Sequence, residues 1–232
     1  MIRHRTVLAM LSFSVLAAVC LLGGVSPAVA ADSDRGEKWQ FYIPVTYIGS
    51  ESIGGENGSQ VDLNSDFSWG FAFGYNFNER LHLGFEITWI DMNYDLTAVR
   101  DANMDGNPDG GSFTASGVLD ASTIGMTGQF NFMETTVTPF IRAGLGSTYV
   151  DSNIPNGDSG TQCWWTWYGY VCGTWQETFS DNFFSYSGAI GVRADMSDTF
   201  FLELSYNSMW IDTDSGDTPN LTGVRMNIGW LF

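Results

Sequence analysis

Five oxygen-bearing residues occupy every second position in the stretch DANMDGNPDGG. They are Asp101, Asn103, Asp105, Asn107 and Asp109. Gly106 follows the third of them, and a glycine there permits the sharp turn by which carboxylate and amide oxygens converge on a Ca²⁺ ion. Because Ser112 stands where an EF-hand would have its bidentate glutamate, the spacing favours a shorter Ca²⁺ turn. The alternative is a solvated, turn-rich loop without a metal.

A second candidate site is the segment CWWTWYGYVC, which begins at Cys163 and ends at Cys172. An oxidising compartment outside the cytoplasm would favour a disulfide between these two cysteines. Clustered aromatic side chains that are exposed usually mark a contact surface. The segment therefore predicts a rigid hairpin that binds a sugar, lipopolysaccharide or a host surface, and the alternative is a lid over the mouth of a barrel. The aromatic residues are Trp164, Trp165, Trp167, Tyr168, Tyr170 and Trp175.

Catalysis and nucleic-acid binding are not expected from the ionisable residues. His82 is the only histidine beyond the first thirty residues, and no nucleophile and base stand in a recognisable arrangement. The strand and turn pattern described below places His82 beside a short turn. Its expected role is to form hydrogen bonds inside the predicted barrel. The chain has 26 acidic and 9 basic residues, a net charge of −17, whereas nucleic acid requires clustered Lys and Arg. No cofactor is expected other than Ca²⁺.

The elements that must position these residues are β-strands, because bulky and small side chains alternate with a period of two. In residues 67–77, for example, six aromatic residues share one face, and Ser, Gly, Ala and Asn share the other. Eight such strands are predicted, at 38–48, 67–77, 81–94, 117–132, 137–149, 183–194, 200–210 and 220–232. Long loops at 49–66, 97–116, 151–182 and 212–219 alternate with short turns at 78–80, 133–136 and 195–198.

This order predicts an all-β fold, an eight-stranded antiparallel transmembrane barrel with its four long loops outside and its short turns in the periplasm. The bulky face must point outward, because so many aromatics would overfill the interior of an eight-stranded barrel. The opposite face carries charges that suit a polar interior, whereas arginine facing lipid costs about 2–4 kcal/mol. These charges predict either a salt-bridged filling or a gated narrow pore. The residues are Glu86, Arg142, Arg193, Glu203 and Arg225.

The two ends of the chain carry targeting signals. Arg3 and Arg5, an apolar run and the small residues Ala28-Val29-Ala30 predict a cleaved signal peptide over residues 1–30. An N-terminal membrane anchor is the alternative. Residues 31–232 then form the barrel domain. The last strand ends on Phe232, with Trp230 and Ile228 on the same face.

The terminal NIGWLF and the stretch TPFIRAGLG, from Thr138 to Gly146, resemble small outer-membrane β-barrel proteins of the OmpA, OmpX and OmpW type. This resemblance implies a monomer in the bacterial outer membrane, in contact with its lipid and lipopolysaccharide. It implies that Ile228, Trp230 and Phe232 are the insertion signal read by the barrel-assembly machinery. The implied function is a non-enzymatic structural or surface-interaction role through the long loops. The alternatives are a narrow pore for small or apolar solutes, as OmpW-like barrels suggest, and a lipid-modifying enzyme.

Overall fold

The computed structural model describes residues 32–54, 59–99, 111–166, 169–213 and 218–232. Within these ranges the side chains of 98–99, 113, 153–166, 169–177 and 179 are not described. No helix in the described part of the chain is long and apolar enough to cross a membrane.

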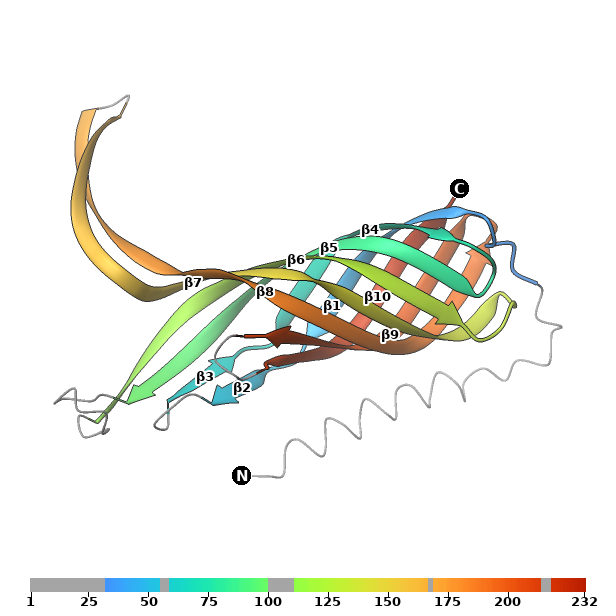
Figure 1. Cartoon of the computed structure of the whole chain (residues 1–232), viewed down its shortest axis with the longest axis horizontal. Coiled ribbons are helices and arrows are strands. Elements are labelled where there is room, and N and C mark those ends of the chain that lie inside the picture. Colours follow the sequence, from blue (N-terminus) through green and yellow to red (C-terminus); the bar gives the residue numbers. More distant parts are fainter. Residues whose placement is uncertain (1–31, 55–58, 100–110, 167–168, 214–217) are drawn as a thin grey trace. The chain divides into compact units, whose positions relative to one another are not determined.

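Eight antiparallel strands close into a barrel, as the sequence predicts (Figure 1). Around the barrel the order is β5-β4-β1-β10-β9-β8-β7-β6, and β6 pairs with β5 to complete the ring. The chain ends meet in this ring, because β1 pairs with β10 from Gln40 opposite Leu231 to Ile48 opposite Gly223. The strands are β1 (Trp39–Ile48), β4 (Asp66–Asn76), β5 (Leu81–Val99), β6 (Ser112–Asn131), β7 (Val137–Thr166), β8 (Gly169–Ser197), β9 (Phe200–Asp212) and β10 (Asn220–Leu231).

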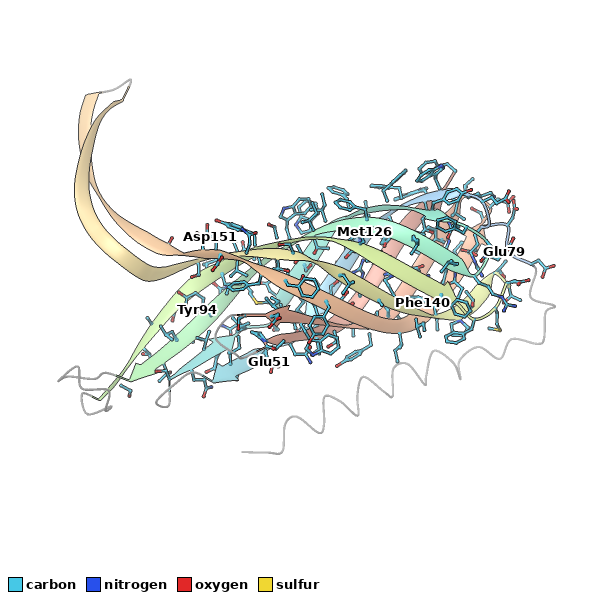
Figure 2. The ribbon with its side chains drawn as sticks, viewed as in Figure 1. Glu51, Glu79, Tyr94, Met126, Phe140 and Asp151 are labelled. Atoms are coloured by element: carbon cyan, nitrogen blue, oxygen red, sulfur yellow. The ribbon has the colours of Figure 1, made fainter. Side chains whose placement is uncertain are left out.

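The predicted direction of the two faces is also confirmed. On β4 the aromatic residues Phe67, Trp69 and Phe71 are exposed on the outer surface, while Ser68 and Ala72 are buried inside. Figure 2 shows side chains projecting outward all along the barrel wall. Glycines on the inner face allow large neighbours to fit. A Cβ atom at Gly74 would lie 2.3 Å from His82 Nε2 and 2.5 Å from the carbonyl oxygen of Leu83, so only glycine fits there.

Three of the predicted loops contain strands. Residues 49–66 hold a hairpin of β2 (Glu51–Gly54) and β3 (Gln60–Leu63), and β3 pairs with the far part of β5. β5 and β6 extend to Val99 and Ser112, into the predicted loop 97–116. β7 and β8 continue into 151–182 as a two-stranded ribbon, as far as Thr166 and Gly169 and past Ser152, the last residue that β6 pairs with (Figure 1). The β7–β8 ribbon lacks clean alternation, because a two-stranded ribbon outside a barrel has no inner face to keep apolar.

The two ends of the barrel differ. The "turn end" holds the short connections at 77–80, 132–136 and 198–199, together with Trp39 and Phe232. The "loop end" holds the long extensions of β5 to β8 and the β2–β3 hairpin. In Figure 2, Glu79 marks the turn end, and Tyr94 lies on the extension at the loop end.

Candidate functional site

The five charged residues predicted for the inner face meet inside the barrel. Arg142 Nη2 on β7 lies 2.5 Å from Glu203 Oε2 on β9, and Arg193 Nη1 on β8 lies 3.3 Å from Glu203 Oε1. The strand register explains the second contact, because Arg193 and Glu203 are direct partners across β8 and β9. Glu203 therefore joins two guanidinium groups, and all three side chains are almost fully buried.

Side-chain amides complete the coordination of Glu203. Gln129 Nε2 donates to its Oε1 at 2.9 Å, and Asn227 Nδ2 donates to its Oε2 at 2.7 Å. An ionised carboxylate has about four sites that accept hydrogen bonds, so two arginines and two amides satisfy it. Gln129 also accepts a hydrogen bond from Arg142 Nε at 3.0 Å, which fixes the orientation of that guanidinium.

Glu86 and Arg225 form a second pair that is linked to the first. Arg225 Nη1 donates to Glu86 Oε1 at 2.8 Å and Arg225 Nη2 donates to Glu86 Oε2 at 2.5 Å, so the pair is bidentate. Arg225 Nε donates to Asn227 Oδ1 at 2.8 Å, and Asn227 in turn contacts Glu203. One connected network, here called the lumenal network, therefore contains all five predicted charges.

Below this network the segment Asp32–Lys38 closes the turn end of the barrel. Arg35 is 0% exposed and donates to main-chain oxygens of two different turns, with Nε 2.5 Å from Glu79 O and Nη2 2.7 Å from Met133 O. Its Nη1 lies 2.5 Å from Asp195 Oδ2, near the end of β8 that leads into the third turn. Because these three groups lie around the rim of the barrel, Arg35 ties its N-terminal segment across the opening.

Asp195 also connects the N-terminal segment to the lumenal network. Asp195 accepts a hydrogen bond from Ser33 Oγ at 2.7 Å and pairs with Arg193 Nε at 2.7 Å. Burial lowers the pKa of the Arg35 guanidinium, and the negative charge of Asp195 opposes that shift. Sequence reasoning missed this role of Arg35, because ADSDRGEK has neither alternation nor apolar residues and is typical of a solvated linker.

At the loop end the inner face becomes apolar. The buried side chains there come from β3 and from seven barrel strands, so they fill the bore from wall to wall. Partly buried Ile53, Val61 and Leu96 pack against them. Apolar side chains that pack in this way exclude water from the outer half of the barrel. The cluster comprises Ile48, Leu63, Ile90, Met92, Tyr94, Ala121, Val150, Phe183, Ile211 and Leu221.

A small cavity separates the apolar cluster from the lumenal network. Its volume is about 60 Å³, which is room for several water molecules. Ile48, Ile90 and Leu221 line its apolar side, and the Glu86–Arg225 pair lines its polar side. Hydroxyl groups also line it, from Thr46, Ser68, Thr88, Thr123, Thr127, Ser185 and Ser187.

His82 lies inside the barrel near the turn end and is 0% exposed. Its ring stands edge-on to Tyr42 at 6.3 Å between centroids. Neither ring nitrogen has a hydrogen-bond partner among the described residues, so the expected hydrogen-bonding role is not seen there. No serine, cysteine or carboxylate is hydrogen-bonded to it within that part of the chain.

The predicted Ca²⁺ ligands, Asp101, Asn103, Asp105, Asn107 and Asp109, lie outside the described residues, and that site stays a prediction. Within the described part no group of three or more His, Cys, Asp or Glu residues could hold a metal ion. The side chains of Cys163, Cys172 and the aromatic residues between them and at Trp175 are likewise not described. The main chain of this segment is described, and it places Cys163 directly opposite Cys172.

The residues predicted as an insertion signal lie on the outer surface at the seam of the barrel. Trp230 and Phe232 are exposed, and Ile228 is partly so. Phe232 N donates to Trp39 O at 3.0 Å, and Trp39 N donates to Phe232 O at 2.9 Å. These two hydrogen bonds close the seam between the first and last strands at the turn end.

An eight-stranded barrel with an apolar outer wall and a charged interior is the architecture of small outer-membrane barrel proteins. The family profile "Outer membrane protein beta-barrel domain" matches residues 16–232, and the chain belongs to this family. It is an outer-membrane β-barrel protein, so its turn end faces the periplasm and its loop end faces the exterior.

Solved structures of similar fold are also outer-membrane barrels, at low sequence identity. The N-terminal barrel domain of Pseudomonas aeruginosa OprF is 10% identical, with a TM-score of 0.47 over 85% of this chain and 98% of that one. Neisserial surface protein A is 12% identical, with a TM-score of 0.47 over 83% and 95%. Pseudomonas aeruginosa OprG is 10% identical, with a TM-score of 0.45 over 86% and 98%. Comparison with curated proteins found no matching sequence.

Proposed function

We propose that this protein is a non-enzymatic, non-conducting barrel that anchors surface-exposed hairpins and loops in the outer membrane. One observation carries the proposal: the bore is filled at three successive levels. The apolar cluster fills it near the outside, the lumenal network fills its middle, and the segment Asp32–Lys38 covers its periplasmic opening.

The alternative of a narrow pore is less well supported by this arrangement. A polar solute would have to displace the apolar cluster, and an apolar solute would then meet the buried charges of Glu203, Arg142 and Arg193. Separating such a buried ion pair is costly, because each charge would lose its partner in a poorly solvated place. The remaining cavity, about 60 Å³, is a small gap between these two fillings.

The purified protein, incorporated into planar lipid bilayers, is therefore expected to give no reproducible conductance steps. The physical reason is that ions find no continuous hydrated path past the three fillings. A wide porin inserted under the same conditions provides the positive control, and heat-unfolded protein provides the negative one. Steps of constant size from the folded protein, absent after unfolding, would support the pore instead.

The proposed surface-interaction role depends on the segments that extend beyond the barrel at its loop end. The β7–β8 ribbon is the longest such extension, and its paired main chain continues to Thr166 opposite Gly169. A ribbon of two strands is marginally stable alone, so a covalent link within it would be valuable. We propose that the Cys163–Cys172 disulfide provides this link and that the aromatic residues inside it form the contact surface. Direct register of the two cysteines supports the link, because partners across antiparallel strands come close enough for a disulfide.

The disulfide predicts a simple labelling result. Under denaturing conditions without a reductant, the mature protein is expected to take up no maleimide, and after reduction it takes up one on each cysteine. The Cys163→Ser variant should be labelled at Cys172 even without reductant, which controls for access. Mass spectrometry of the intact protein counts the labels. Two labels on the unreduced parent would exclude the bond.

A further inference from the structure

Three aspartates form a row on the outer surface near the loop end of the barrel. Asp91 on β5 lies directly opposite Asp120 on β6, and Asp120 lies directly opposite Asp151 on β7. Side chains of direct partners are about 5 Å apart, and like charges in that position repel each other. Among the described residues, no Lys or Arg is paired with any of these three carboxylates. Within the described part of the chain, therefore, no basic side chain compensates this repulsion.

Two residues further along each of the same three strands, towards the middle of the membrane, the side chains form an aromatic notch. Ser122 on β6 lies between its direct partners Trp89 on β5 and Tyr149 on β7. A serine is much smaller than the rings on either side, so the surface is hollowed above it. This groove, here called the notch, has a volume of about 330 Å³, and its lining also includes Trp69 and the three aspartates. Such a volume lies within the usual range for small-ligand sites.

Below the notch the barrel wall is largely apolar. The next outward rows contain Ile124 beside Ser147, then Phe85, Met126 and Leu145, all of them exposed. Because this is the outer surface of an outer-membrane barrel, these side chains face lipid tails. A ligand that enters the notch from the membrane must therefore combine a hydrocarbon part, lying along this wall, with a head group at the height of the aspartates.

The chemistry of the notch selects a cationic head group. Indole and phenol rings attract an ammonium through their π faces, and carboxylates accept hydrogen bonds from its N–H groups. A quaternary ammonium has no N–H to donate. An anionic head group would add to the repulsion among the three aspartates. We propose that the notch formed by Trp89, Ser122 and Tyr149, with the row Asp91–Asp120–Asp151, binds the head group of a membrane lipid that carries a primary amine. This site lies on the barrel wall, and it does not depend on the role proposed for the loops.

Two phospholipids that differ only in methylation of the amine test the proposal. The folded protein in detergent is mixed with phosphatidylethanolamine or with phosphatidylcholine of identical acyl chains, and native mass spectrometry measures the lipid retained. We expect the primary amine to be retained about tenfold more strongly, since it can donate a hydrogen bond to a carboxylate, worth about 1.5 kcal/mol, which the quaternary amine cannot. Equal retention of the two lipids would overturn the proposal.

Two substitutions and one control locate the effect. Asp120→Asn removes the central charge, and Ser122→Trp fills the notch without changing any charge; both are expected to abolish the preference. Asp212→Asn changes an exposed aspartate on β9 that does not line the notch, and it should keep the preference. An equal loss in all three variants, or none in the first two, would contradict the site.

The thermal stability of the protein in detergent, measured without added lipid, distinguishes a role of Asp120 in lipid binding from a role in folding. Asp120→Asn relieves repulsion between direct partners, so its thermal unfolding is expected at the parent temperature or above it. If Asp120 were needed for folding instead, the variant would unfold at a lower temperature with no lipid present, and the proposal would fail.

Discussion

Glu203→Ala is expected to lower the free energy of unfolding by about 3–5 kcal/mol, because it leaves buried charges without their counter-ion. Arg142 and Arg193 both contact Glu203, and both are buried in the barrel. Arg193 keeps Asp195 as an ionic partner, whereas Arg142 keeps neutral contacts, the hydrogen bond to Gln129 and the rings of Tyr42 and Phe140. Gln129 and Asn227 would also lose the oxygen atoms to which they donate. Two amides and a guanidinium therefore become under-satisfied in one substitution.

Urea unfolding in detergent or lipid vesicles, followed by the heat-dependent shift in gel mobility, measures this loss. The matched control is Glu134→Ala, whose partner Arg80 lies 2.9 Å away at the solvent-exposed turn end. Both of those side chains are about half exposed, and such pairs contribute at most about 1 kcal/mol. Equal effects of the two substitutions would mean that water reaches Glu203, and the bore would then be open to solvent.

The sequence alone could predict the barrel and the membership of the lumenal network. Alternation assigns each residue to a face, and a charge such as Arg225 on the small face of a strand must point inward. It could not predict which charges meet. The contact of Arg193 with Glu203 depends on the register of β8 against β9, and that of Glu86 with Arg225 crosses the bore between strands that are not neighbours.

Other features of the structure could not be predicted, because no local sequence pattern marks them. The Asp91–Asp120–Asp151 row consists of single residues far apart in the chain, and only the register of three strands brings them side by side. The β2–β3 hairpin forms because Leu63 joins the apolar cluster at the loop end. This tertiary contact cannot be predicted from the sequence of the hairpin, because that stretch is polar and rich in glycine. Arg35 belongs to this group too, because its partners are main-chain oxygens of distant turns.

Arg35→Ala is expected to release the N-terminal segment while the barrel stays folded. The substitution removes the donors to Glu79 O and Met133 O and the ion pair with Asp195. Hydrogen bonds to a charged group contribute about 1.5–3 kcal/mol each. However, the segment can detach locally, so the barrel strands need not unfold. If the substitution removes about 3 kcal/mol from the free energy needed to detach the segment, the population of protein with a detached segment rises by roughly two orders of magnitude.

The chain offers a clean readout of that opening, because Lys38 is its only lysine. A lysine-specific protease can therefore cut at one place, directly after the segment that covers the opening. Where opening is fast relative to cleavage, the cleavage rate follows the population of the open state. Arg35→Ala should raise the rate about 100-fold, and mass spectrometry should find an otherwise intact barrel that begins at Trp39. Ser33→Ala, which removes a single hydrogen bond to Asp195, should raise it by a smaller factor, about tenfold if that bond contributes about 1.5 kcal/mol. A parent protein cleaved as fast as Arg35→Ala would show that the segment does not cover the periplasmic opening, and the bore would lose one of its three fillings.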